Sequence, residues 1–129
     1  MTPVDVAAAL ESFQTPLDVR YVDGHTWIVL TEFVYVSPRI TVRIPAGTET
    51  DFASVPRFFW RIISPTDKHI GKPALVHDHL YRQKHLHVTR QFADEELRHA
   101  MHSVGAPLWK RSVVYAGVRM FGGSAWVER

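Results

Sequence analysis

Two segments of the sequence place chemically active side chains among apolar neighbours. They are residues 50–57, TDFASVPR, and residues 77–82, HDHLYR. A plain hydrophobic core would use Val or Leu at such positions, because burying a polar group without a partner is costly. The two segments therefore indicate a site. Histidines also gather here, since six of the eight in the chain lie between residues 77 and 102.

The second segment predicts a helix that carries four reactive groups within two turns. His77 and Tyr81 are four residues apart and share a helix face, and Asp78 and Arg82 share the next. Asp94 lies early in the following predicted helix. A short connection makes these two helices antiparallel neighbours, so we expect Asp94 to face His77.

This set of groups is suited to hydrolysis. A carboxylate on one imidazole nitrogen fixes the tautomer and makes the other nitrogen a better base, so a pair formed by His77 and Asp94 can activate water. Alternatively, His77 and Asp78, with Asp51 as the third ligand, hold a divalent metal such as zinc or calcium. Asp51 or Asp78 would hold the metal or a polarised water, so both schemes require that Asp51 and His77 meet in space.

Each of these residues also has a purely structural interpretation. Asp78 and Arg82 are spaced as a helical ion pair, His77 fits a buried hydrogen-bonded residue, and Asp94 fits a charge in a first helical turn. Asp51 fits a cap for the turn that follows it. Taken singly, none of them establishes a site.

Ser54 and Arg57 complete the first segment as supporting residues. Ser54 lacks the Gly-x-Ser-x-Gly context of a nucleophile elbow, so its hydroxyl is better suited to capping than to nucleophilic attack.

Composition limits the class of protein. The chain has 129 residues, 46% of them hydrophobic and 22% charged, which is enough for one globular domain. The absence of cysteine excludes disulfides and thiol nucleophiles. A net charge of +2 is too low for a dedicated nucleic-acid binder. No apolar run is long enough for a membrane span, and the N-terminus lacks the features of a secretory signal.

Hydrophobic periodicity predicts an α+β domain over residues 1–129, with residues 1–50 mainly strands and 51–129 mainly helices. We expect an antiparallel meander of about three to four strands followed by about three packed helices. The expected strands are residues 17–22, 25–36, 40–44 and 48–51, and the expected helices are residues 73–83, 90–104 and 108–121. Local signals set several of these boundaries: Asp23-Gly24 predicts a hairpin turn, Thr89 and Gly105 predict the start and end of the second helix, and Gly122-Gly123 predicts the end of the third.

The last expected helix is apolar almost all round and has basic residues at its edges. One interpretation is a buried core helix. The other is a docking surface for a partner, with Trp109 and Trp126 as anchors.

The paired motifs resemble those of a phage and prophage family catalogued as Domain of Unknown Function 1353. The likeness covers roughly residues 40–126, and the sequence departs from the usual family pattern at Phe52 and His79. It implies a phage or prophage origin and supplies no activity. A looser likeness, limited to the order His-Asp-x-x-Tyr with a later Asp, is to the catalytic helix of phospholipase A2.

Two functional hypotheses follow. In the first, the protein is a phage hydrolase, with or without a metal, that cleaves an ester, phosphoester or peptide-like bond of the bacterial envelope. In the second, it is a structural or assembly component of the phage tail without catalytic activity. Both hypotheses predict that the protein associates with other virion proteins or with further copies of itself. Both also predict that it lies in the host cytoplasm during assembly and then in the virion.

Overall fold

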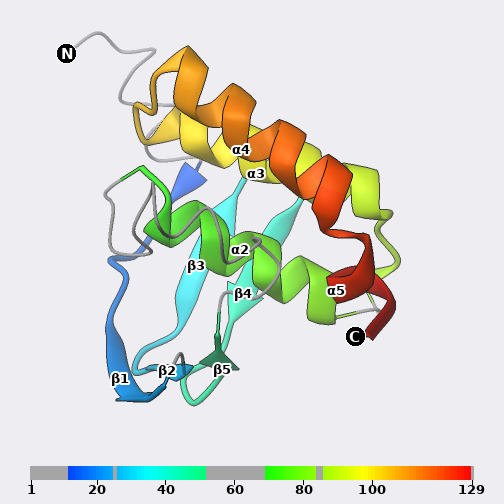
Figure 1. The fold of residues 1–129 in the computed structure, drawn as a ribbon. Coiled ribbons are helices and arrows are strands. Elements are labelled where there is room, and N and C mark those ends of the chain that lie inside the picture. Colours follow the sequence, from blue (N-terminus) through cyan, green and yellow to red (C-terminus); the bar gives the residue numbers. More distant parts are fainter. Residues whose placement is uncertain (1–11, 25, 52–68, 84–85, 129) are drawn as a thin grey trace, which may run out of the picture. The chain divides into compact units, whose positions relative to one another are not determined.

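The computed structural model describes residues 12–24, 26–51, 69–83 and 86–128 (Figure 1). The chain folds as two compact units, Met1–Asp51 and Phe52–Arg129. Their boundary lies next to the predicted change from strands to helices. The α+β class is confirmed, because antiparallel strands come first and packed helices follow.

The first unit contains two small antiparallel sheets. Strands β1 (Val19–Asp23), β2 (Thr26–Val29) and β5 (Glu49–Thr50) form one sheet in the order β1-β2-β5, and β3 (Phe33–Val36) pairs with β4 (Thr41–Ile44) in the other. Tyr21 pairs with Trp27 in the first sheet, and Tyr35 pairs with Val42 in the second.

The structure corrects the single long strand expected over residues 25–36. Within the described residues, that stretch forms β2 and β3 in two different sheets, separated at residues 30–32. Thr31 and Glu32 are exposed there, and the amide of Leu30 bonds the carbonyl of Asp18 at 2.8 Å. Apolar residues on both sides of this short break hide it from periodicity.

The turns of this unit follow from their residues. Gly24 adopts a φ of 52°, which an ordinary side chain rarely tolerates, and it closes the predicted hairpin between β1 and β2. Between β3 and β4, the hydroxyl of Ser37 accepts hydrogen bonds from the amides of Arg39 and Ile40, both at 3.2 Å.

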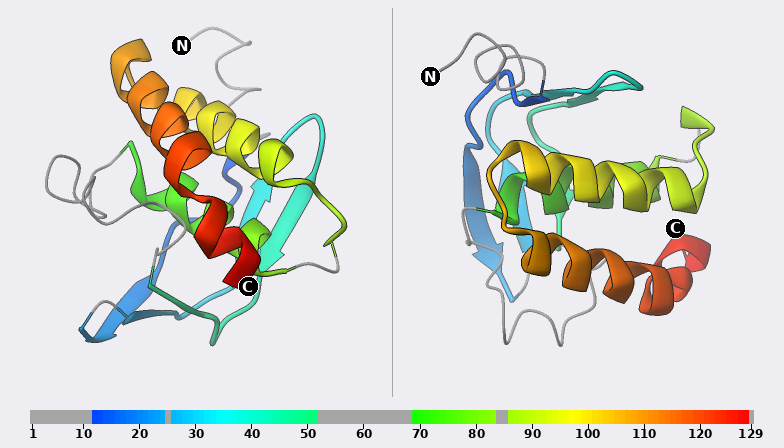
Figure 2. Two further views of the ribbon diagram at one scale, coloured as in Figure 1. Left: turned by 45° about the vertical axis from the view of Figure 1, so that its right-hand side comes forward. Right: turned by 90° about the horizontal axis from the view of Figure 1, so that it is seen from above.

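The second unit is a small helical assembly. Helices α2 (Gly71–Arg82), α3 (Arg90–Ser103) and α4 (Leu108–Phe121) correspond to the three expected helices, and a short helix α5 (Gly123–Glu128) follows. Helix α3 packs against both α2 and α4, and α5 packs against α2 and α4. Helices α3 and α4 lie side by side and run in opposite directions (Figure 2).

Two predicted helix boundaries are confirmed in atomic detail. The hydroxyl of Thr89 accepts the amide of Phe92 at 3.0 Å and so caps the start of α3. Gly105 follows α3 with a φ of 87°, the left-handed conformation typical of a residue that ends a helix. These two signals hold α3, and with it Asp94, in the expected register.

Helix α5 is an unexpected element, because Gly122 and Gly123 predict the end of the helical region. The chain nevertheless forms one more turn, in which the amide of Trp126 bonds the carbonyl of Gly122 at 3.2 Å. The indole of Trp126 packs edge-on against Tyr81 of α2. This tertiary contact stabilises a turn that the local sequence disfavours.

None of the helices in the described part of the chain has the length and apolar character needed to cross a membrane.

Candidate functional site

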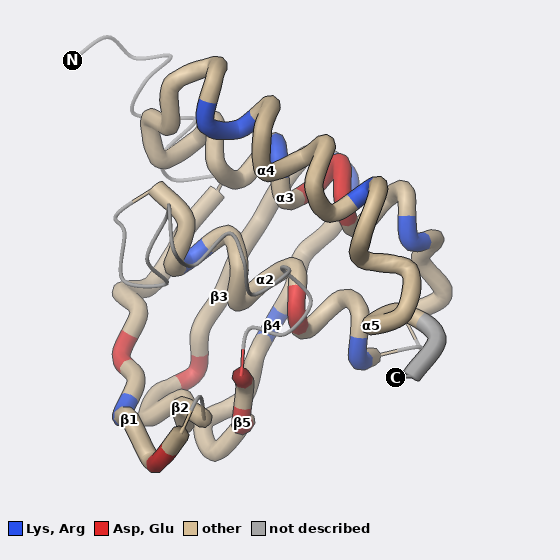
Figure 3. Tube along the Cα trace, viewed as in Figure 1, with Lys and Arg blue, Asp and Glu red and all other residues tan. Residues whose placement is uncertain are grey.

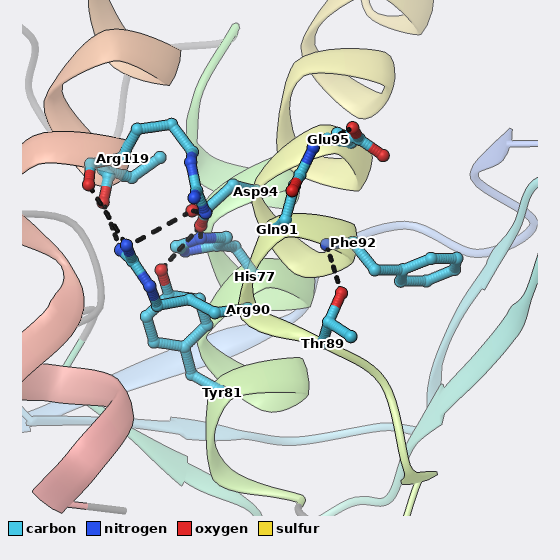
Figure 4. A network of polar contacts seen from close by, with 10 residues as sticks. His77, Tyr81, Thr89, Arg90, Gln91, Phe92, Asp94, Glu95 and Arg119 are labelled. Carbon is cyan, nitrogen blue, oxygen red and sulfur yellow. Dashed lines mark hydrogen bonds and ion pairs between the residues drawn. The ribbon is translucent and has the colours of Figure 1, made fainter.

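The buried centre of the second unit is a carboxylate that binds two side chains of α2. Oδ1 of Asp94 lies 2.7 Å from Nε2 of His77 and 2.6 Å from the hydroxyl of Tyr81 (Figure 4). All three side chains are fully buried. The spacing of four residues on α2 places the imidazole and the phenol one turn apart, where a single oxygen can accept both hydrogen bonds.

Apolar residues on the two helices bring these groups together. Helix α2 buries Ala74, Leu75 and Leu80 around His77, and α3 buries Ala93 and Leu97 beside Asp94. Nearly all of α2 is buried, so the position of the imidazole is determined by packing on several sides.

The other oxygen of Asp94 faces α4. Nη1 of Arg119 donates to Oδ2 at 2.8 Å, and Nη1 of Arg90 lies 3.8 Å from the same oxygen. Arg90 also donates to the backbone carbonyls of Val118 and Arg119 at 3.0 and 3.2 Å. Residues from α2, α3 and α4 therefore meet at one carboxylate.

These contacts determine the protonation state of the network. Burial by itself raises the pKa of Asp94, but the hydrogen bonds from His77, Tyr81 and Arg119, together with the electrostatic effect of His77, outweigh it and hold that pKa below its ordinary value. Burial, together with the hydrogen bond to Asp94, raises the pKa of Tyr81 well above its ordinary value. Asp94 is thus an anion and Tyr81 a neutral donor. An anionic Oδ1 requires that Nε2 of His77 carries a proton.

Aromatic packing holds the Tyr81 side chain in place. Its ring centroid lies 4.2 Å from that of His77 and 5.2 Å from that of Trp126. Gly122 also approaches the phenol closely, because a Cβ atom built on it would lie 2.9 Å from the Tyr81 hydroxyl. The phenol therefore has little room to leave Asp94.

A second carboxylate of α2 forms a separate ion pair. Oδ2 of Asp78 lies 3.1 Å from Nε of Arg82, in the helical spacing noted in the sequence. Asp78 is only 1% exposed, so this pair differs from an ordinary surface ion pair.

The structure brings together His77, Tyr81 and Asp94 as expected, and Asp78 with Arg82. Asp51 ends the first unit, so the geometry of the second unit does not include it. Ser54 and Arg57 lie outside the described residues. Among the proposed anchors, Trp109 is exposed whereas Trp126 is partly buried against Tyr81.

The spacing of residues in the sequence did not identify the two arginines that contact Asp94. Arg90 lies four residues before Asp94 on α3, so helical spacing was a usable signal for it. Arg119 is 25 residues from Asp94 in sequence and is one of the basic residues at the edge of the last expected helix. Its contact depends on how α3 and α4 pack.

The described residues also bear on the possible metal. Within residues 12–24, 26–51, 69–83 and 86–128, no group of three His, Cys, Asp or Glu side chains is arranged as metal ligands. Nε2 of His77 is engaged by Asp94, and Oδ2 of Asp78 lies against Arg82. A metal at this place would need Nδ1 of His77 and would compete with Arg82 for Asp78.

Comparison with known proteins identifies a family for this chain, and the matching family and relative carry no assigned activity. The sequence model of the family described as "Protein of unknown function (DUF1353)" matches residues 27–118. A stretch of 80 residues is 31% identical to the uncharacterized protein y4jT of Sinorhizobium fredii. It covers 61% of this chain and 23% of that relative, so the chain spans about a quarter of the relative's length. No solved structure matches the chain.

Proposed function

Because the chain belongs to this family of unknown function, we propose an activity from its geometry: a phage or prophage hydrolase, associated with the virion tail, whose general base is His77. One observation carries the proposal. Asp94 holds the imidazole by Nε2 at 2.7 Å, and the carboxylate is itself held by Tyr81 and Arg119. A core built only for stability would not need an anion with three donors at its centre.

The proposed reaction follows from the tautomer. With a proton on Nε2, Nδ1 of His77 carries the lone pair that accepts a proton from water. The resulting hydroxide adds to the carbonyl carbon or the phosphorus of the substrate. The bond to the leaving group then breaks, and His77 returns its proton to the departing oxygen or nitrogen. Asp94 stabilises the imidazolium formed in between.

The substrate class follows from the proposed setting. A tail-associated hydrolase meets the bacterial envelope, so we propose an ester, phosphoester or peptide-like bond of that envelope as its target. Full burial of His77 means that the reaction requires local opening around α2.

A metal-assisted form of this reaction is a variant of the same proposal. His77 and Asp78 would supply nitrogen and carboxylate ligands of the kinds that suit zinc. A zinc or calcium ion would supply a polarised water. Arg82 already neutralises Asp78, which favours the metal-free form.

A second candidate function is a structural or assembly component of the tail without catalysis. Complete burial of His77, Tyr81 and Asp94 favours it, because a buried hydrogen-bonded network can serve to specify how helices pack. In this case the network orients α2, α3 and α4, and the protein acts through its surface.

The two candidates are separated by one comparison of variants. Wild-type protein, His77→Gln and the control His99→Gln are assayed for hydrolysis of carboxylic esters, phosphodiesters and cell-wall peptides, and their metal content is measured by elemental analysis. His99 lies on α3 outside the Asp94 network. The hydrolase proposal expects wild-type and His99→Gln protein to turn over one substrate class and His77→Gln, still folded, to lose it.

The opposite results support assembly. Wild-type protein that hydrolyses none of these substrates, or a His77→Gln variant that keeps full activity, rules out His77 as the base. A stoichiometric metal that is lost in both His77→Gln and Asp78→Asn instead supports the metal-assisted form of the hydrolase.

A further inference from the structure

Three pairs of side chains meet across the antiparallel helices α3 and α4 at regular intervals. The pairs are Asp94 with Arg119, Arg98 with Tyr115, and His102 with Arg111. Successive members on each helix are four residues apart, so the pairs form the rungs of a ladder, about 6 Å from one rung to the next along the helices. The ladder places Arg98 and Arg111 on neighbouring rungs.

The second and third rungs hold these two guanidinium groups at the surface. The guanidinium carbon of Arg98 lies 4.1 Å from the centre of the Tyr115 ring. Nη1 of Arg111 donates to Nδ1 of His102 at 2.6 Å and to the carbonyl of Ala106 at 3.4 Å. Arginine carries only donors, so the His102 nitrogen must be the acceptor. These contacts position both groups without neutralising their charge.

The carboxylate of the ladder belongs to its first rung, where Asp94 neutralises Arg119. Within the described part of the chain, neither Arg98 nor Arg111 forms an ion pair with a carboxylate. Glu95, one turn before Arg98, accepts a hydrogen bond from another side chain of α3. Helix α4 contains no acidic residue, and Figure 3 shows only basic positions along it. The positive charge of the two outer rungs is therefore left for a ligand.

The free donors of these rungs indicate the chemistry of that ligand. A guanidinium has five N–H donors in one plane. Stacking on Tyr115 uses the face of Arg98 and leaves its N–H edge open, and the hydrogen bonds of Arg111 use only Nη1. One guanidinium suffices for the two oxygens and single charge of a carboxylate. Two of them match the three oxygens and nearly two negative charges of a phosphate monoester.

We propose that Arg98 and Arg111 bind the phosphate group of a phosphate monoester at the outer rungs of the α3–α4 ladder. Tyr115 and His102 are the residues that position the two guanidinium groups. The site lies one and two turns beyond Asp94 along the helices and does not involve His77. It goes beyond the proposed hydrolase and stands whether or not His77 is catalytic.

The test titrates the full-length protein at low ionic strength with phenyl phosphate, inorganic phosphate and acetate, and follows binding by isothermal titration calorimetry. Both phosphates are expected to bind at least tenfold more tightly than acetate. Arg98→Met and Arg111→Met should each weaken the binding of phenyl phosphate about tenfold or more, because each variant removes charge-assisted hydrogen bonds.

Arg20→Met is the matched control, because it removes an exposed arginine of the first unit and lowers the net charge equally. It should bind phenyl phosphate like wild type, and circular dichroism checks that all variants are folded. The proposal is overturned if wild type binds no phosphate, if acetate binds equally well, or if Arg20→Met is weakened as much as the other two variants.

Vesicles that contain phosphatidic acid distinguish two sources of the phosphate group. Retention on these vesicles that phenyl phosphate relieves and Arg98→Met abolishes supports the site and assigns it to a lipid headgroup. Binding of phenyl phosphate without retention on vesicles supports the site and assigns it to a soluble ester. A single-stranded oligonucleotide that binds at least tenfold more tightly than phenyl phosphate makes a polymer the ligand and overturns the proposal.

Discussion

Arg119 of α4 donates to Oδ2 of Asp94 in α3 at 2.8 Å, while the other oxygen of the same carboxylate accepts both side chains from α2. This contact, together with the bonds from Arg90 to the carbonyls of Val118 and Arg119, joins α4 to the network that α2 and α3 form. Arg119 is the most exposed member of the network, with 34% of its side chain exposed against 24% for Arg90. Its removal is therefore the mildest way to disturb Asp94.

Substituting Arg119 by methionine should lower the free energy of unfolding by about 1 to 2 kcal/mol, because Asp94 loses a charged hydrogen-bond donor at a partly exposed position. Urea denaturation measures this effect. Arg111→Met is the matched control on the same helix, since Arg111 contacts the exposed His102 and not Asp94. Equal losses in the two variants would show that the contact with Asp94 contributes nothing specific.

The depressed pKa of Asp94 predicts acid sensitivity. As the pH falls, the unfolded chain takes up a proton on this carboxyl before the folded protein does. The contribution of Asp94 to stability is therefore complete above the unfolded value of about 3.9 and is lost as the pH falls through the folded pKa. Urea midpoints measured between neutral and acid pH should fall more steeply for wild type than for Asp94→Asn.

Asp18→Asn is the control for this experiment, because Asp18 is an exposed carboxylate of the first unit. It should retain the wild-type dependence on acid pH. If Asp94→Asn retains the same dependence as well, the carboxylate is not the group that the network stabilises.

The raised pKa of Tyr81 predicts that the protein loses stability at alkaline pH. Because its pKa is raised in the folded protein, the unfolded chain loses this proton first, and stability should fall as the pH rises above about 10. In an ultraviolet titration, the phenol of Tyr81 should stay protonated until the protein unfolds. Tyr81→Phe should remove its share of the absorbance change at that late step and lower stability at neutral pH by about 1.5 to 3 kcal/mol, through loss of the bond to Asp94.

Gly122 offers a test of the packing around Tyr81. A Cβ atom at this position would lie 2.5 Å from the Val118 carbonyl oxygen and 2.9 Å from the Tyr81 hydroxyl, so Gly122→Ala must displace one of them. We expect a loss of about 1 to 3 kcal/mol in unfolding free energy. Gly123→Ala is the adjacent control, because a Cβ there meets nothing within 4 Å and should leave stability near that of wild type.

If the displaced group is the phenol, Gly122→Ala should also lower the alkaline pH at which Tyr81 titrates. A normal titration in a destabilised Gly122→Ala variant would instead place the strain in the backbone at Val118.

The sequence by itself determined the order of strands and helices and the helix face that carries His77 and Tyr81. The caps at Thr89 and Gly105, and the spacing of His77 and Tyr81, depend on local backbone geometry, which repeats every turn and can be recognised without a partner. The α+β order follows from the same periodicity. The family motifs, too, are local patterns.

Only the tertiary structure decided which groups share Asp94. Arg119 comes from a helix distant in sequence, and its approach depends on the packing of α3 against α4. The division of residues 25–36 between two sheets and the extra turn of α5 have the same origin, since contacts outside the segment select them. Long-range packing places side chains at distances that local periodicity does not encode, and it made an ordinary basic helix edge part of a buried charge network.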